Sequence, residues 1–164
     1  MNRIVITIII AALATCSCAS LSKTTEARNA EKQRTASQVA DKLDSKQFSV
    51  EVNYMISMRG GGKSVSGGYA VTVDGSEIDS RLPYAGQARN VPYGGGKVLT
   101  FKDEIDDYKD SGWDNGKREI VFSTDNDEDK LVYHITVYED GTANVFVSSL
   151  NRDSITYRGR LLLE

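Results

Sequence analysis

The feature that most constrains this fold is the stretch Lys130–Ser149, in which large apolar side chains recur at every second position. A period of two places alternate side chains on opposite faces of an extended strand. One face of residues 130–138 is therefore apolar; it consists of Leu131, Tyr133, Ile135 and Val137. Residues 139–141, Glu-Asp-Gly, then supply a turn, and the alternation resumes at Ala143. The stretch predicts a β-hairpin.

Similar short runs rich in Val, Ile, Tyr and Phe recur along the chain, separated by glycine-rich turns. The chain has 14 glycines and 2 prolines, and no helical periodicity of useful length follows Leu43. We therefore predict an all-β antiparallel domain over residues 47–164, either a small barrel or a sandwich of about eight short strands. The predicted strands fall in residues 48–58, 69–73, 76–82, 119–124, 130–138, 143–149 and 154–161, and residues 97–101 and 104–108 are either two further short strands or a strand and a turn.

The first of these runs alternates without interruption, which predicts a single inward face made of Phe48, Val50, Val52, Tyr54, Ile56 and Met58. Residues 82–96, which contain both prolines, and the polar residues 110–116 are predicted as loops. Residues 59–64 form another predicted loop. This loop ends in Gly-Lys-Ser but lacks the earlier glycine and the following helix of a phosphate-binding loop, so no nucleotide cofactor is expected.

Residues 1–15 have the pattern of a secretory signal peptide. Arg3 supplies a positive charge, Ile4–Leu13 is an apolar run interrupted only by Thr7, and small residues follow. The apolar run is about half of the ~20 residues that a membrane-spanning helix needs. We therefore predict that the segment is cleaved.

The cysteine that follows this segment predicts a lipid anchor. Residues 13–16, Leu-Ala-Thr-Cys, resemble a bacterial lipobox, in which the cysteine is acylated and becomes the new N-terminus. We expect acylated Cys16 to hold the domain on a membrane in the periplasm or at the outer membrane. Two alternatives stay open: Cys18 as the acceptor, and ordinary secretion with cleavage after Ala14 or Ala19.

Residues 16–46 are predicted as a tether and helix, and from Ser20 to Ser45 the composition differs from the rest of the chain, with almost nothing apolar before Val39. Good helix formers begin near Thr25, and Val39, Ala40 and Leu43 share one helical face. We predict a flexible spacer that passes into a helix ending near residues 44–45, with apolar contacts only in its last two turns. Such a segment is either a stalk or a frayed terminus.

The composition excludes several classes of function. The formal charge of −3 lacks the basic surface that a nucleic-acid partner requires. Both cysteines precede the predicted domain and His134 is the only histidine, which disfavours a zinc site and a histidine- or cysteine-dependent hydrolase. Three aspartates in residues 125–129 have the spacing that begins a calcium loop, but Lys130 occupies the place of its glycine. We expect no metal and no cofactor.

The better candidates for a binding site are aromatic side chains on the predicted loops. We select Tyr84, Arg89, Tyr93 and Trp113, because aromatics at one end of a barrel or sandwich stack on sugars or enclose apolar ligands. The simpler alternative is that Tyr84 and Tyr93 close the end of the barrel by packing.

Two segments near the ends of the domain resemble a known family. These are Leu-Pro-Tyr-x-Gly at 82–86 and Asn-Arg-Asp-Ser-Ile-Thr-Tyr-Arg-Gly at 151–159. With the residues between them, they make the chain resemble, over residues 48–161, an uncharacterised Bacteroidetes family called domain of unknown function 4251. The resemblance implies a secreted or lipid-anchored β-rich protein without an assigned activity. Ala85 stands where an aromatic is expected, and Gln87 where an arginine is expected.

These observations favour a non-enzymatic, lipid-anchored envelope protein that binds a small ligand or a partner protein through loops at one end of its β domain. The alternative is a hydrolase of envelope or glycan substrates that uses two carboxylates of the cluster at 103–107 as acid and base. That cluster comprises Asp103, Glu104, Asp106 and Asp107. A third possibility is a structural subunit of an envelope assembly.

Overall fold

The structure is a computed structural model that describes residues 18–87, 99–126 and 129–163. The chain divides into two units, residues 1–35 and 36–164. Helix α2 (Cys18–Asp44) ends where the sequence predicts. The spacer predicted at Ser20 is helical instead, because its Ala, Glu, Lys, Arg and Gln residues are good helix formers. In the described residues, no helix has the length and apolar content needed to cross a bilayer.

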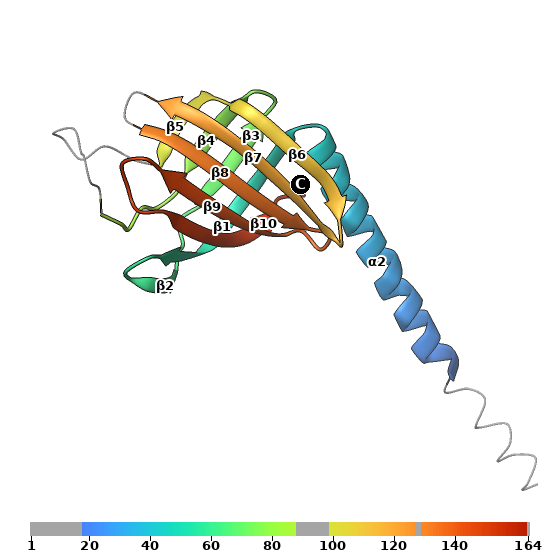
Figure 1. The fold of residues 1–164 in the computed structure, drawn as a ribbon. Coiled ribbons are helices and arrows are strands. Elements are labelled where there is room, and N and C mark those ends of the chain that lie inside the picture. Colours follow the sequence, from blue (N-terminus) through green and yellow to red (C-terminus); the bar gives the residue numbers. More distant parts are fainter. Residues whose placement is uncertain (1–17, 88–98, 127–128, 164) are drawn as a thin grey trace, which may run out of the picture. The chain divides into compact units, whose positions relative to one another are not determined.

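The described part of the second unit contains one antiparallel sheet, which confirms the predicted fold class. Its strands are β1 (Gln47–Ser57), β2 (Gly61–Ser64), β3 (Ala70–Asp74), β4 (Glu77–Arg81), β5 (Thr100–Glu104), β6 (Asp106–Asp114), β7 (Lys117–Asn126), β8 (Asp129–Tyr138), β9 (Thr142–Ser149) and β10 (Ile155–Leu161). Their order in the sheet is β5-β4-β3-β1-β10-β9-β8-β7-β6, and β2 pairs with β1 off this path. The sheet curls around a common interior (Figure 1).

The two ends of the sheet meet through consecutive strands. Strands β5 and β6 are separated only by Ile105, yet β5 pairs with β4 and β6 pairs with β7. The side chain of Thr124 on β7 donates a hydrogen bond of 2.6 Å to Asp103 on β5. The bent β5–β6 segment therefore nearly closes the sheet, which makes the domain barrel-like rather than a sandwich of two sheets.

Large side chains fill the barrel. All four apolar residues of the opening pattern are buried, as predicted: Leu131, Tyr133, Ile135 and Val137. The rings of Phe122 and Tyr133 stack with centroids 5.1 Å apart. The Tyr133 hydroxyl donates to Ser80, whose own hydroxyl donates to the carbonyl of Leu99, so both of these buried hydroxyls have hydrogen-bond partners. Val39 and Leu43 of α2 are fully buried, which confirms that the last two turns make the apolar contacts.

The alternation predicted for β1 is wrong beyond Val52. The ladder with β10 shifts between Val52 and Tyr54, so Asn53 has no partner in it. An unpaired residue of this kind, a β-bulge, moves every later side chain to the other face. As a result Met55 is buried, while Met58 is 74% exposed.

The predicted loop at residues 110–116 is also wrong. Residues 106–114 form strand β6, and only Asn115 and Gly116, both with positive φ, make the turn to β7. β6 is the last strand of the sheet and two bulges interrupt its ladder, so it has no continuous buried face and shows no alternation. The predicted loop at 59–64 likewise contains the short strand β2.

Candidate functional site

The two predicted binding residues that the structure describes, Tyr84 and Trp113, do not come together. Tyr84 lies at one end of the barrel, next to Asp153. Trp113 on β6 is the strand partner of Arg118 on β7. Arg118 is in turn the strand partner of Val137 on β8. Strand β8 begins at Asp129, near Tyr84, and Val137 is eight residues further along, a distance of ~27 Å in an extended strand. Tyr84 and Trp113 therefore mark opposite ends. Arg89, Tyr93 and the predicted acyl acceptor Cys16 lie outside the described residues.

The end that carries Tyr84 (residues 82–87, 129–131 and 149–155) is called the mouth below. Here the two segments that carry the family resemblance contact each other. The Tyr84 hydroxyl lies 3.1 Å from the carbonyl of Gln87 and 3.3 Å from that of Asp153. Gln87 and Asp153 exchange two further hydrogen bonds. The Tyr157 hydroxyl donates to the carbonyl of Pro83 at 2.7 Å.

The Tyr84 hydroxyl donates to backbone carbonyls that hold the two segments together. Burial raises its pKa above the ordinary 10.0, and the nearby Asp153 carboxylate raises it further. The group therefore stays protonated at neutral pH. The geometry agrees with the simpler alternative, in which Tyr84 closes the end of the barrel.

Beneath Tyr84 lies a buried ion pair. The side chains of Arg152 and Asp129 are each 2% exposed, and the Arg152 Nε is 4.0 Å from Asp129 Oδ2. Ser149 and Asn151 also donate hydrogen bonds to the Asp129 carboxylate. The space left between Tyr84 and these groups is about 10 Å³, at most room for one water molecule. Among the described residues, side chains thus fill the space between Tyr84 and this ion pair.

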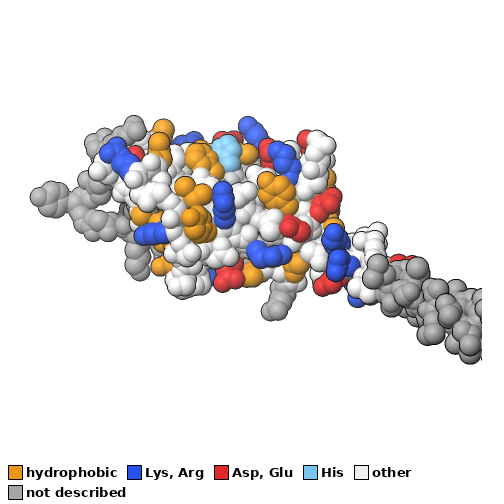
Figure 2. Space-filling model, turned by 90° about the horizontal axis from the view of Figure 1, so that it is seen from below, with side chains coloured by type: hydrophobic (Ala, Val, Ile, Leu, Met, Phe, Trp, Pro, Cys, Tyr) orange, Lys and Arg blue, Asp and Glu red, His pale blue; other side chains and the backbone are white. Residues whose placement is uncertain are grey.

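The groups considered for catalysis do not assemble at the mouth. His134 lies on the outer face of β8, where Figure 2 shows it in pale blue, with its ring 5.8 Å from that of Phe146. Among the described residues, no group of three or more His, Cys, Asp or Glu is placed to hold a metal ion.

The carboxylates of the alternative hydrolase are divided between two places. An open groove of about 460 Å³ over β3, β4 and β5 is lined by Asp103 and Glu104, among other residues. Asp103 accepts hydrogen bonds from Thr124 and from the amide of Glu104. Asp106 and Asp107 begin the edge strand β6 and are not among the residues that line the groove.

Two residues that the sequence reasoning missed lie on neighbouring loops at the mouth. Met58, after β1, and Leu150, after β9, are each 74% exposed. Both strands flank β10, and Arg59 contacts Asp153 at 3.4 Å, so the two loops are adjacent. Their signal in the sequence is a large apolar residue directly beside turn residues, Arg-Gly-Gly-Gly in one case and Asn in the other. A side chain in that position has no core to enter.

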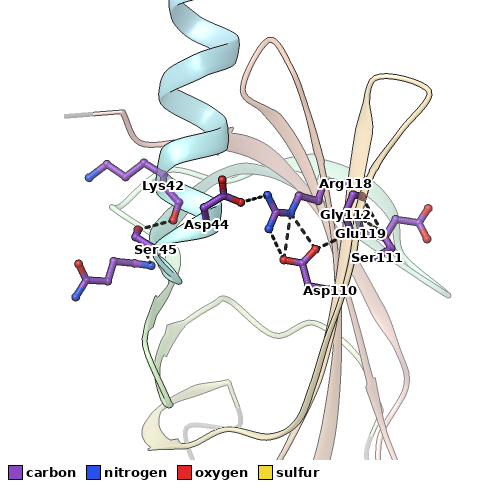
Figure 3. A network of polar contacts seen from close by, with 9 residues as sticks. Lys42, Asp44, Ser45, Asp110, Ser111, Gly112, Arg118 and Glu119 are labelled. Carbon is purple, nitrogen blue, oxygen red and sulfur yellow. Dashed lines mark hydrogen bonds and ion pairs between the residues drawn. The ribbon is translucent and has the colours of Figure 1, made fainter.

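The opposite end of the barrel holds the end of α2 through Arg118 (Figure 3). The Arg118 Nε donates to both carboxylate oxygens of Asp110, and its Nη1 donates to Asp44 at 2.5 Å. The Arg118 side chain is only 10% exposed, so this pairing is partly shielded from water. Asp44 is the last residue of α2, and the network therefore attaches the end of the helix to β6 and β7.

This network predicts a loss of stability in acid. Hydrogen bonds from Arg118 hold the pKa of Asp110 below its ordinary 3.8. A lowered pKa stabilises the fold above pH 3.8, and that contribution disappears as the pH falls through the lowered value. Urea titrations give the free energy of unfolding at neutral pH and at a pH below 3.8. Between these two pH values, this free energy should fall more in the wild-type chain than in Asp110→Asn. Equal losses in both proteins would contradict the role assigned to this carboxylate.

Comparisons with known proteins identify a family and a fold. A family model described as "Domain of unknown function (DUF4251)" matches residues 30–161. A search of curated proteins found no match. The crystal structure of a DUF4251 family protein from Bacteroides eggerthii is similar, with a TM-score of 0.59 and 21% sequence identity; the match covers 78% of this chain and 87% of that one.

Proposed function

The chain belongs to the DUF4251 family of unknown function, and we propose that it is a non-enzymatic, lipid-anchored envelope protein that binds a partner protein through loops at the mouth. The barrel interior is filled by side chains such as Phe122, Tyr133 and Tyr157, and the space beside Tyr84 is too small for an organic ligand. A partner that docks on the outside fits this interior better than a small ligand that enters it.

The proposed anchor is Cys16, two residues before α2. Each buried CH₂ of an attached acyl chain contributes about 0.8 kcal/mol to membrane binding. The described side chains of α2 from residue 24 to residue 34 are exposed, which suits a spacer between anchor and domain. Mass spectrometry of the mature N-terminus distinguishes acylation at Cys16 from acylation at Cys18.

The main observation that supports the proposal is the exposure of Met58 and Leu150. Large apolar side chains that are three-quarters exposed on adjacent loops are typical of an interaction surface. Full burial of each side chain against a partner would contribute about 2 kcal/mol. The ion pair between Arg59 and Asp153 lies beside them and gives the surface a polar rim.

Photocrosslinking in cells tests this proposal. A photoreactive amino acid at position 58 or 150 should yield an adduct of discrete mass with one envelope protein. The matched control is the same residue at position 109, an exposed site on the edge strand β6, which should yield none. Equal yields of adduct at all three positions, or no adduct at positions 58 and 150, would contradict the proposal that the loops at the mouth are the binding surface.

The hydrolase alternative depends on the groove over β3–β5, because Asp103 and Glu104 line that open groove. Turnover of a glycoside or ester that disappears in Asp103→Asn would replace our proposal.

A further inference from the structure

We propose that the outer face of β9, β10 and β1 binds an extended segment of a partner protein in which a carboxylate, held by Arg158, lies between apolar side chains. This inference rests on the proposed function and specifies the chemistry of the partner. The face is called the β10 face below and comprises Phe146 and Leu150 from the β9 side, Thr156 and Arg158 from β10, and Tyr54, Ile56 and Met58 from the β1 side.

Strand register places these residues in rows across the sheet. Thr156 lies between Phe146 on β9 and Ile56 on β1. In the next row Arg158 lies opposite Tyr54. Two columns of side chains thus flank the middle strand: Tyr54 and Ile56 on β1, and Phe146 with the polar Asn144 on β9. Neighbouring strands are ~4.8 Å apart, so the columns are separated by about 10 Å, the width that one extended peptide occupies.

The side chains of this face are accessible. Phe146 is 38% exposed, and the columns continue at the mouth into Met58 and Leu150. The Tyr54 ring lies over Gly62 of β2, where an added Cβ would be 2.2 Å from the tyrosine hydroxyl. That contact holds the ring against the sheet. Figure 2 shows hydrophobic and basic side chains interspersed on the surface around the histidine.

The positive charge on Arg158 indicates which chemical group of the bound segment would lie beside it. Within the described residues, its exposed side chain makes no ion pair or hydrogen bond with another side chain. The neighbouring arginines differ, since Arg59 pairs with Asp153 and Arg160 donates to the carbonyl of Asp140. Arg158 lies opposite Tyr54, and arginine and tyrosine are enriched among the residues that dominate binding energy in protein interfaces. An aspartate or glutamate of the partner would complete this site.

Selection of random peptides displayed on phage against the mature chain tests the inference. Enriched peptides should contain Asp or Glu with apolar residues on both sides. Binding of a selected synthetic peptide should weaken about tenfold or more in Arg158→Glu, because a salt bridge becomes a repulsion. The matched control, Lys109→Glu on β6, makes the same change of charge elsewhere and should bind as the wild type does. Circular dichroism verifies that each variant is folded.

A second selection on Arg158→Glu sharpens the test, since it should enrich Lys or Arg in place of the acidic residue. The inference is overturned if the selected peptides lack an acidic residue or bind Arg158→Glu as well as the wild type. Peptides that depend only on Met58 and Leu150 would overturn it while leaving the proposed function intact. Arg158-dependent binding to anionic vesicles, or Arg158-dependent self-association without peptide binding, would assign the face to a lipid surface or to a second copy instead.

Discussion

Gly159→Ala should lower the free energy of unfolding by about 3 kcal/mol, and by more if the strands cannot move apart. An added Cβ at this position would lie 1.9 Å from the carbonyl oxygen of Glu51 and 2.8 Å from the Cα of Val52. Both contacts are with backbone, so no flexible side chain can move aside. The measurement is urea denaturation followed by far-UV circular dichroism.

The control for this prediction is Gly60→Ala. A Cβ there would meet only the hydroxyl of Ser57, at 2.8 Å, and that group can rotate away. Equal denaturation midpoints for the two variants would show that β1 does not approach β10 as closely as the bulge at Asn53 requires. The prediction also explains why the segment that carries the family resemblance ends in glycine.

Arg152→Met should destabilise the fold by about 3 kcal/mol. Methionine keeps most of the apolar length of the side chain but removes the cation from beside the Asp129 carboxylate, which is 2% exposed. Charges out of contact with water depend on such pairing far more than surface charges do. Thermal and urea unfolding both measure the loss.

The matched control is Arg59→Met, which breaks the ion pair with Asp153 at the surface. The Arg59 side chain is 69% exposed, so its loss should cost less than about 1 kcal/mol. If Arg152→Met proved no less stable than Arg59→Met, the buried pair would contribute nothing to holding the mouth closed.

The candidate site shows where reasoning from the sequence stops. The sequence predicts that Tyr84 lies outside the strands, because the prolines and glycines around it exclude a central strand, and the structure has it between β4 and β5 at one end of the barrel. Trp113 was placed in a loop because its neighbours are polar, yet an edge strand needs no apolar face. The pairing of Arg152 with Asp129 joins residues 23 positions apart in the chain, and no local pattern reports it.

Local patterns in the chain are enough to predict the β class, the end of α2 near Asp44 and the inward faces of β8 and β9, since side-chain alternation is a local property. The reversal of the faces of β1 after Asn53, which exposes Met58 and turns Tyr54 and Ile56 outward beside Arg158, depends on the packing of the whole sheet. A bulge exists only relative to a partner strand. The register of β1 is set by β10, more than a hundred residues away, and that distant backbone decides which side chains reach the solvent.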